Sequence, residues 1–214
     1  MSYHHMNWRG FWMASVISIL TLLQVNPSLG CTIAVVSGQV TEDGRPLLWK
    51  NRDTSSARNM VQVFIDGQYR VMAIVDAEDP DRIWMGMNDA GLCLVNSLSL
   101  DLPGGSKTGR GNGRFMKMAL QNCATAADFE NLLRETNQSG RRTRANFGLI
   151  DTHGAALIYE TGHRTFVKFD ANDAKLTPRG YVVRSNFAMT AAGAKQQGKA
   201  HDFLNVYSGR RYVR

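Results

Sequence analysis

The sequence places a cysteine directly after a segment that has the features of an export signal. Residues 1–30 begin with a mildly basic stretch and continue as an apolar run over residues 11–25. Small residues, Ser28 and Gly30, stand at the third and first positions before Cys31, where signal peptidase requires them. Cleavage after Gly30 would therefore make Cys31 the first residue of the mature chain.

A cysteine at the amino terminus carries a nucleophile and a base in one residue. The thiol attacks a carbonyl carbon, and the free α-amine, with a reference pKa of about 7.7–8.0, accepts the thiol proton near neutral pH. We therefore expect Cys31 to be the nucleophile of an amide hydrolase or an acyltransferase.

The segment could also be processed in two other ways. A lipoprotein signal is also cut before a cysteine, although it usually has leucine three places earlier, where this chain has Ser28. Lipidation would cap the amine, and Cys31 would then be only the anchor of an exported, non-catalytic binding domain. Self-cleavage of the bond between Gly30 and Cys31 would expose the same terminus as signal peptidase does.

The residues after Cys31 predict a β-hairpin that returns a carboxylate to it. Residues 31–37 are rich in strand-forming residues, Asp43-Gly44 is a strong turn signal, and residues 46–51 read as the returning strand. A hairpin of this length brings Asp53 back beside Cys31, where a carboxylate can hold an N-terminal ammonium.

The rest of the chain predicts strands, then two helices, then strands again, with a last helix over residues 199–207. The two central helices show helical spacing of apolar residues, and the second begins at a capping box, Thr125 to Asp128. We expect the basic segment 141–144 to be a solvated loop. The order of elements indicates an α+β fold with antiparallel sheets covered by helices. The predicted strands after the hairpin are 61–65, 69–75, 83–87, 92–98, 146–151, 155–160, 165–169 and 181–187.

Composition bounds the remaining possibilities. Removal of residues 1–30 from the 214-residue chain leaves 184 residues, enough for one domain with a core, residues 31–214. The net charge of +7 comes from scattered basic residues without a dense basic helix or zinc-finger spacing, so we expect no nucleic-acid partner.

The cysteine and histidine spacings favour neither a metal site nor a cofactor. In an exported protein Cys93 and Cys123 could pair, although the apolar surroundings of Cys93 favour two buried thiols.

Several motifs, taken in order, resemble one enzyme family. They are Gly30-Cys31-Thr32, the segment Gly-Arg-Pro-Leu-Leu-Trp-Lys-Asn-Arg-Asp at 44–53, Gly-Met-Asn-Asp-Ala-Gly-Leu at 86–92 with Asn96, and Val-Arg-Ser-Asn-Phe at 183–187. Together they resemble the isopenicillin N acyltransferase branch of the N-terminal-nucleophile (Ntn) hydrolases, which is related to choloylglycine hydrolases and acid ceramidase-like amidases. The resemblance runs from Cys31 to the last residue.

The resemblance implies a fold and a set of roles. The implied fold is the four-layer αββα sandwich, and because family members usually continue further, we expect it to be incomplete at the C-terminus. Cys31 would be the nucleophile and Asp53 the residue that orients it. Asn96 and Asn186 match the asparagines that line the oxyanion hole or fix the amine, and Arg211 resembles a late arginine near the nucleophile.

One position departs from the pattern of the related hydrolases. Choloylglycine hydrolases carry arginine directly before the asparagine of this motif, where this chain has Lys50, with Arg52 two residues later. Lysine cannot form the same bidentate fork, and we assign both residues to substrate binding.

The expected protein is a periplasmic or extracellular hydrolase or acyltransferase without a membrane span once the leader is removed. Its substrates would be small linear amides such as N-acyl amino acids, penicillins or bile-salt-like conjugates, and its oligomeric state is left open.

Overall fold

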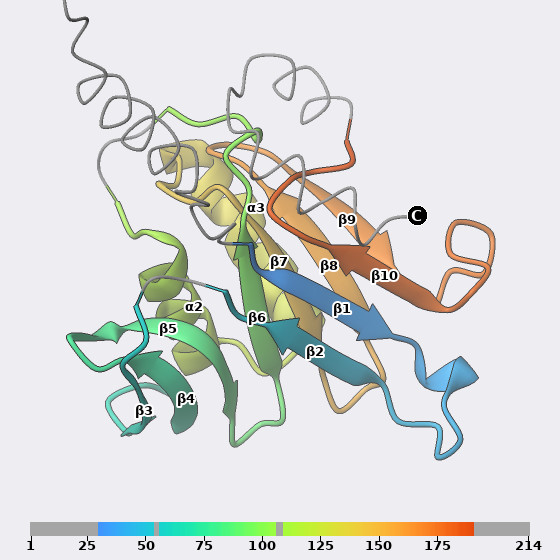
Figure 1. Ribbon diagram of the computed structural model, residues 1–214, viewed down its shortest axis with the longest axis horizontal. Coiled ribbons are helices and arrows are strands. Elements are labelled where there is room, and N and C mark those ends of the chain that lie inside the picture. The colour runs from blue at the N-terminus through green and yellow to red at the C-terminus, as the bar shows by residue number, and fades with distance from the viewer. Residues whose placement is uncertain (1–29, 54–55, 106–108, 191–214) are drawn as a thin grey trace, which may run out of the picture.

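The computed structural model describes residues 30–53, 56–105 and 109–190 of the chain. Two antiparallel sheets and two helices form three stacked layers in this part of the protein (Figure 1). Most of the leader (residues 1–29), the helix expected over residues 199–207, and Arg211 lie outside the described residues.

The smaller sheet is built on the predicted hairpin. Strands β1 (Thr32–Val36) and β2 (Leu47–Asn51) pair antiparallel, and β10 (Tyr181–Arg184) pairs with the other edge of β1. The connection from β1 to β2 is longer than a tight hairpin turn, because it contains a short 3₁₀ helix, η1 (Gly38–Val40). The register places Thr32 opposite Asn51, so the residues after β2 lie beside Cys31.

The larger sheet has seven strands that follow one another in sequence order, each antiparallel to the next. Its order is β3-β4-β5-β6-β7-β8-β9, with the two helices inserted between β6 and β7. Its strands are β3 (Asn59–Phe64), β4 (Val71–Asp76), β5 (Asp79–Asn88), β6 (Cys93–Leu98), β7 (Ala145–Ile150), β8 (Ala156–Thr161) and β9 (Phe166–Asp170).

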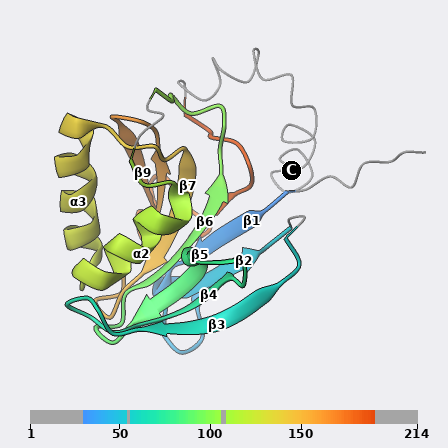
Figure 2. The same ribbon diagram turned by 90° about the vertical axis from the view of Figure 1, so that its left-hand side faces the viewer.

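Helices α2 (Asn112–Asn122) and α3 (Ala126–Ser139) cover one face of the larger sheet (Figure 2). Their apolar faces meet the sheet in a cluster of aromatic rings, in which Phe129 lies 5.9 Å from Phe147 and 5.4 Å from Tyr159 between ring centroids. Full burial of one large apolar side chain is worth about 1.5–3 kcal/mol, so this cluster holds the helices on the sheet.

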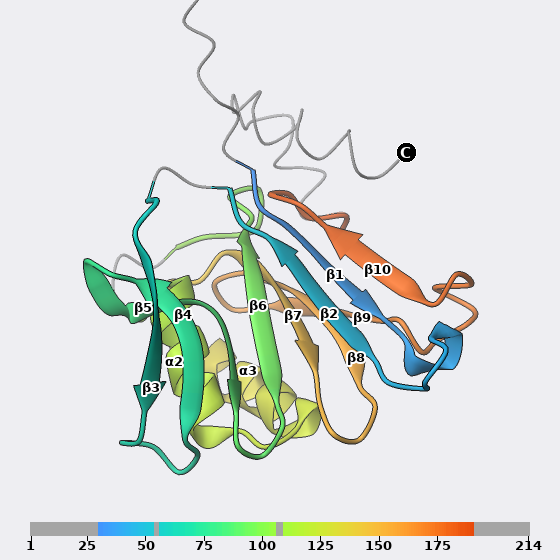
Figure 3. The ribbon, with the colours of Figure 1, turned by 60° about the horizontal axis from the view of Figure 1, so that its bottom comes forward.

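The smaller sheet packs on the opposite face of the larger one, with β1 and β2 lying over β6 and β7 (Figure 3). Ile33 and Val35 of β1 are fully buried against Val95 and Ile158 of the larger sheet. Gly148 of β7 allows the sheets to approach, because a Cβ there would come within 3.2–3.4 Å of side chains from both sheets. Cys31 therefore directly precedes a strand that packs against the larger sheet.

The α+β class and the antiparallel sheets predicted from the sequence are confirmed. Three of the four expected layers are present in residues 30–53, 56–105 and 109–190; a second helical layer over β10-β1-β2 is not among them. Cys93 and Cys123 are free thiols, and burial raises the pKa of Cys123 to about 12. No helix in the described part of the chain is long and apolar enough to cross a membrane.

The expectation of a solvated loop at residues 141–144 is wrong for two of its residues, because Arg141 and Thr143 are buried. Arg141 is only 3% exposed, whereas Arg142 is exposed. The guanidinium of Arg141 can be buried because it donates hydrogen bonds to the carbonyl oxygens of Leu133 in α3 and Gly162 in the turn after β8.

Candidate active site

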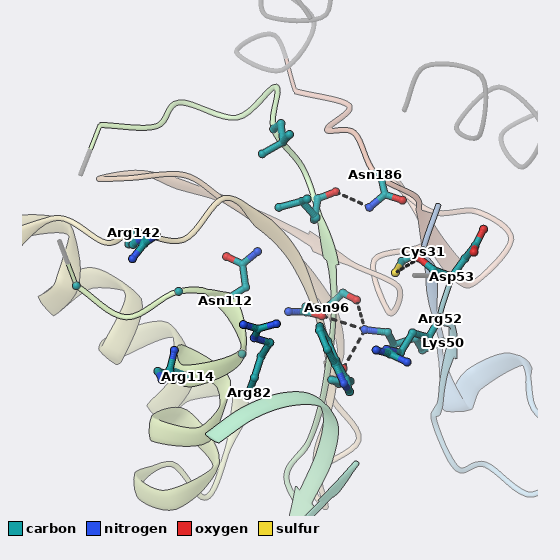
Figure 4. A pocket seen from close by; sticks show the side chains of 16 residues that line it. Cys31, Lys50, Arg52, Asp53, Arg82, Asn96, Asn112, Arg114, Arg142 and Asn186 are labelled. Atoms are coloured by element: carbon teal, nitrogen blue, oxygen red, sulfur yellow. Dashed lines mark hydrogen bonds between the residues drawn. The ribbon is translucent and has the colours of Figure 1, made fainter. Parts of the chain in front are cut away.

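A pocket of about 630 Å³ opens at Cys31, between the ends of the two sheets and the start of α2 (Figure 4). It brings together Cys31, which directly precedes β1, with residues from β2, β5 and β6 and from the segment after β10. All of the predicted site residues that the structure describes line this pocket, namely Cys31, Lys50, Arg52, Asp53, Asn96 and Asn186.

Asp53 contacts the residues on both sides of the expected cleavage point. The Gly30 N–H donates a hydrogen bond to Asp53 Oδ2 at 3.1 Å, and the Cys31 thiol donates to the Asp53 carbonyl oxygen at 3.6 Å. The pairing of β1 with β2 produces these contacts, as the hairpin argument predicted. The carboxylate thus lies one peptide unit from the position where a free α-amine of Cys31 would stand.

Lys50 extends from β2 to the larger sheet and uses its whole donor capacity there. Its ammonium donates to the carbonyl oxygens of Trp84 at 2.9 Å and Asn96 at 2.6 Å, and to Asn96 Oδ1 at 2.9 Å. An ammonium has three N–H donors, so each has one acceptor. Burial lowers the pKa of Lys50 to about 8; the electrostatic interaction with Cys31 acts against this shift, and the charge of Arg52 adds to it.

Asn96 lies on β6 with its amide oxygen facing Lys50 and its amide nitrogen facing the pocket (Figure 4). The residue is 7% exposed, and its Nδ2 has no acceptor among the residues that the structure describes. Because Nδ2 is open to the pocket, it can donate a hydrogen bond to a substrate oxygen at this point. This geometry suits a donor to a developing oxyanion.

Asn186 is fixed in a different way, after the end of β10. Its Nδ2 donates to the Leu98 carbonyl oxygen at 2.8 Å, whereas its Oδ1 is buried without a hydrogen-bond partner among the described residues. The side-chain atom of Asn186 that remains available for a hydrogen bond is therefore an acceptor, Oδ1. Of the two roles that the resemblance allowed, this arrangement fits the fixing of an amine better than oxyanion binding.

Arg52 stacks on an aromatic ring that the sequence analysis did not single out. Its guanidinium lies 4.2 Å from the ring centroid of Trp84, and its Nε and Nη2 atoms are buried without acceptors in the described part of the chain. Burial lowers the pKa of Arg52, and the charges of Cys31 and Asp76 oppose that shift. The residue contributes a positive charge close to Cys31.

The wall of the pocket opposite Cys31 is formed by residues that sequence reasoning did not identify. Arg82, Arg114 and Arg142 line it together with Asn112 (Figure 4). Asp79 pairs with Arg114 at 2.9 Å and with Arg82 at 3.5 Å, while no acidic residue in the described ranges pairs with Arg142. The basic, glycine-rich composition before α2 is a sequence signal for part of this wall, whereas nothing in the pattern around Arg82 indicates it.

The described residues contain no group of three His, Cys, Asp or Glu side chains that could hold a metal ion. The thiol, carboxylate, amide and cationic groups at the pocket are of the types that acyl transfer from an amide to a thiol can use.

Comparison with solved structures identifies the architecture. The chain is similar to the N-acylethanolamine-hydrolyzing acid amidase ortholog of Caenorhabditis elegans, at 15% identity and a TM-score of 0.54, over 78% of this chain and 73% of that chain. It is also similar to a mutant of the conjugated bile acid hydrolase of Clostridium perfringens, at 15% identity and a TM-score of 0.50, over 67% of this chain. The match spans 51% of the bile acid hydrolase.

This chain has the fold of the Ntn hydrolases. The fold implied by the motifs around Cys31 is thereby confirmed. No family model matches the sequence, and no curated protein sequence matches it. At 15% identity the structural likeness concerns the Ntn-hydrolase fold itself, so the function has to be argued from the pocket.

Proposed function

We propose that the mature protein begins at Cys31 and cleaves linear amide C–N bonds of small molecules through a thioester on that residue. The observation that carries the proposal is the contact of one residue, Asp53, with both Gly30 N and Cys31 Sγ at the mouth of a pocket. In the Ntn-hydrolase fold this arrangement supports a terminal cysteine that acts as nucleophile and base together.

Removal of the leader is a requirement of this chemistry. While Gly30 is attached, the nitrogen of Cys31 belongs to an amide and has no useful basicity. Cleavage after Gly30, by signal peptidase or by self-cleavage, would release an α-amine whose reference pKa is about 7.7–8.0. Asp53 Oδ2, which now accepts the Gly30 N–H, would then orient the new ammonium.

The reaction follows from the groups around the pocket. The α-amine takes the thiol proton, and the Cys31 sulfur attacks the amide carbon, which places negative charge on the carbonyl oxygen. The ammonium gives its proton to the nitrogen of the leaving amine as the C–N bond breaks. The acyl group remains as a thioester. Attack by water makes the protein a hydrolase, and attack by a second amine makes it an acyltransferase.

The two asparagines take different parts in this scheme. Asn96 Nδ2 is the donor to the oxyanion, and loss of one such donor typically costs about 2.7–4 kcal/mol of transition-state stabilisation. Asn186 Oδ1 accepts from the α-amine and holds it toward the sulfur. Arg211, beyond the described residues, is proposed as the late arginine near the nucleophile.

The charge of the pocket favours substrates that carry an anion. Five cationic side chains and one carboxylate line it, with Lys50 and Arg52 on the side of Cys31 and the remaining arginines on the opposite wall. N-acyl amino acids, penicillins and bile-salt-like conjugates combine a linear amide with a negatively charged group. We assign the substrate to this class and the protein to the periplasm or the extracellular space.

The decisive experiment examines the exported full-length protein by N-terminal sequencing and intact mass, followed by labelling with a thiol-reactive acyl probe. We expect a chain that starts at free Cys31 and takes up one probe, and we expect no uptake by Cys31→Ser. Hydrolysis of an N-acyl amino acid should fall to background in the same variant. A retained leader, or a diacylglyceryl group on Cys31, would contradict the mechanism and favour a lipid-anchored binding domain.

A further inference from the structure

We propose that Lys50 is a positioning residue that fixes the Asn96 amide and so holds its N–H toward the reacting carbonyl oxygen. The inference rests on the proposed amide-cleaving function and goes beyond it, because it assigns Lys50 to the orientation of Asn96 instead of to substrate binding. It also gives the enzyme a specific response to alkaline pH.

The geometry carries the assignment. Two of the three Lys50 donors go to the same residue, one to the Asn96 carbonyl oxygen at 2.6 Å and one to Asn96 Oδ1 at 2.9 Å. This pair of bonds fixes the side-chain amide relative to its own backbone. With Oδ1 engaged, Nδ2 is directed away from Lys50 toward the pocket (Figure 4). The positive charge next to Oδ1 also polarises the amide and strengthens Nδ2 as a donor.

The third bond anchors Lys50 itself. It goes to the Trp84 carbonyl oxygen on β5, at 2.9 Å, so the lysine of one sheet is held by two adjacent strands of the other. A side chain with three fixed acceptors loses its rotational freedom, and the amide that it holds is oriented before the substrate arrives. Such preorganisation of donors is the main source of oxyanion stabilisation in enzymes.

A lysine at this position can lose its proton within a pH range in which an arginine stays protonated. The groups that face its ammonium are Cys31, just before β1, and Arg52, just after its own strand, while β5 and β6 contribute Trp84 and Asn96, which do not titrate. Burial lowers the pKa of Lys50 to about 8. The neutral amine has only two N–H donors for three acceptors, so deprotonation releases part of the hold on Asn96.

The sign of the pH effect follows directly. The protonated form holds Asn96, so the contribution of Lys50 to kcat is fully present well below pH 8 and is lost above it. Ionisation of Lys50 at about pH 8, with an inactive neutral form, by itself lowers this contribution about eightfold between about pH 7.5 and pH 9. Lys50→Arg, which stays charged at these pH values, should abolish this decline while retaining activity at neutral pH.

The test measures kcat and KM from about pH 6.5 to 9.5 for the mature enzyme with an N-acyl amino acid. We expect Lys50→Met and Asn96→Ala each to lower kcat about 10²-fold, with KM changed less than about threefold. The double variant Lys50→Met with Asn96→Ala should have the same kcat as Asn96→Ala alone, because the two residues act as one unit. Arg45→Met removes an exposed charge from the hairpin connection as the matched control and should leave the profile unchanged.

Two results would overturn the assignment. An alkaline decline that persists in Lys50→Arg would assign the ionisation to another group, and multiplicative losses in the double variant would show that Lys50 acts independently of Asn96. A measurement without turnover separates this inference from the proposed function: in Cys31→Ala, NMR should show the Asn96 side-chain amide shifting with the same midpoint as Lys50. Absence of that coupling would refute the inference whether or not the enzyme cleaves amides.

Discussion

Arg141 shows how one side chain joins a helix to a neighbouring turn. It follows directly after Gly140, the C-cap of α3, and its guanidinium lies back against the helix. Arg141 Nη1 donates to the Leu133 carbonyl oxygen at 2.6 Å, and Nη2 donates to the Gly162 carbonyl oxygen at 3.1 Å. The guanidinium is buried without a carboxylate partner among the described residues, and burial lowers its pKa to about 10. The residue joins α3 to the turn after β8.

Arg141→Met should therefore lower the free energy of unfolding by about 2–3 kcal/mol, because several buried carbonyl oxygens lose a charged donor. Urea denaturation followed by circular dichroism measures this loss. The neighbouring Arg142→Met removes the same charge from an exposed side chain and should change stability by less than about 0.5 kcal/mol. Equal losses in the two variants would contradict the role given to Arg141.

At the scale of elements, the start of α3 depends on a reciprocal cap. The Thr125 hydroxyl accepts the Asp128 N–H at 3.2 Å, and the Asp128 carboxylate accepts the Thr125 N–H at 3.0 Å. Two of the helix's free N-terminal groups are satisfied in this way. The Thr125 hydroxyl donates to the Asp128 carboxylate and is the main reason that the pKa of Asp128 is lowered. The cap fixes where α3 begins, and with it the fit of Phe129 on the larger sheet.

Thr125→Ala should destabilise the protein by about 1 kcal/mol, since a lost N-cap typically costs about 0.5–2 kcal/mol. Thr125→Ser keeps the hydroxyl and should remain close to the parent protein. The comparison of the two midpoints in thermal unfolding isolates the hydrogen bond from the loss of a methyl group. A serine variant as unstable as the alanine variant would show that the methyl packing, and not the cap, matters here.

At the scale of the whole molecule, a buried ion pair joins the two sheets. Arg184 of β10 donates to Glu160 of β8 at 2.5 Å, and the two residues are 7% and 1% exposed. Glu160 also accepts the backbone N–H groups of Met189 and Thr190, so the carboxylate ties the segment after β10 to the larger sheet. That segment contains Asn186, which links the ion pair to the pocket.

Arg184→Met should lower the free energy of unfolding by about 3–5 kcal/mol, because it leaves a buried carboxylate without its cation. Chemical denaturation at neutral pH measures the loss, and Arg179→Met on the exposed turn is the matched control. The double variant Arg184→Met with Glu160→Leu should lose less than the sum of the two single changes. Strict additivity would refute the coupling of the sheets through this pair.

The sequence by itself determined the features that depend on neighbours along the chain. Strand periodicity and the turn at Asp43-Gly44 gave the hairpin, and the hairpin brings Asp53 to Cys31. The capping signal at Thr125 gave the start of α3. These features follow from local hydrogen bonding and from spacing within one or two elements, so the residues that encode them stand close together in the sequence.

The tertiary structure alone decided which distant residues share the pocket. Lys50 meets Asn96 only because β2 lies over β6, and Arg82 faces Cys31 only because β5 and α2 form the opposite wall. Alternation along a strand tells which residues face a neighbouring layer, but it does not give the partner strand or the register between layers. Those depend on how complete side chains pack between the sheets, which is a property of the assembled core.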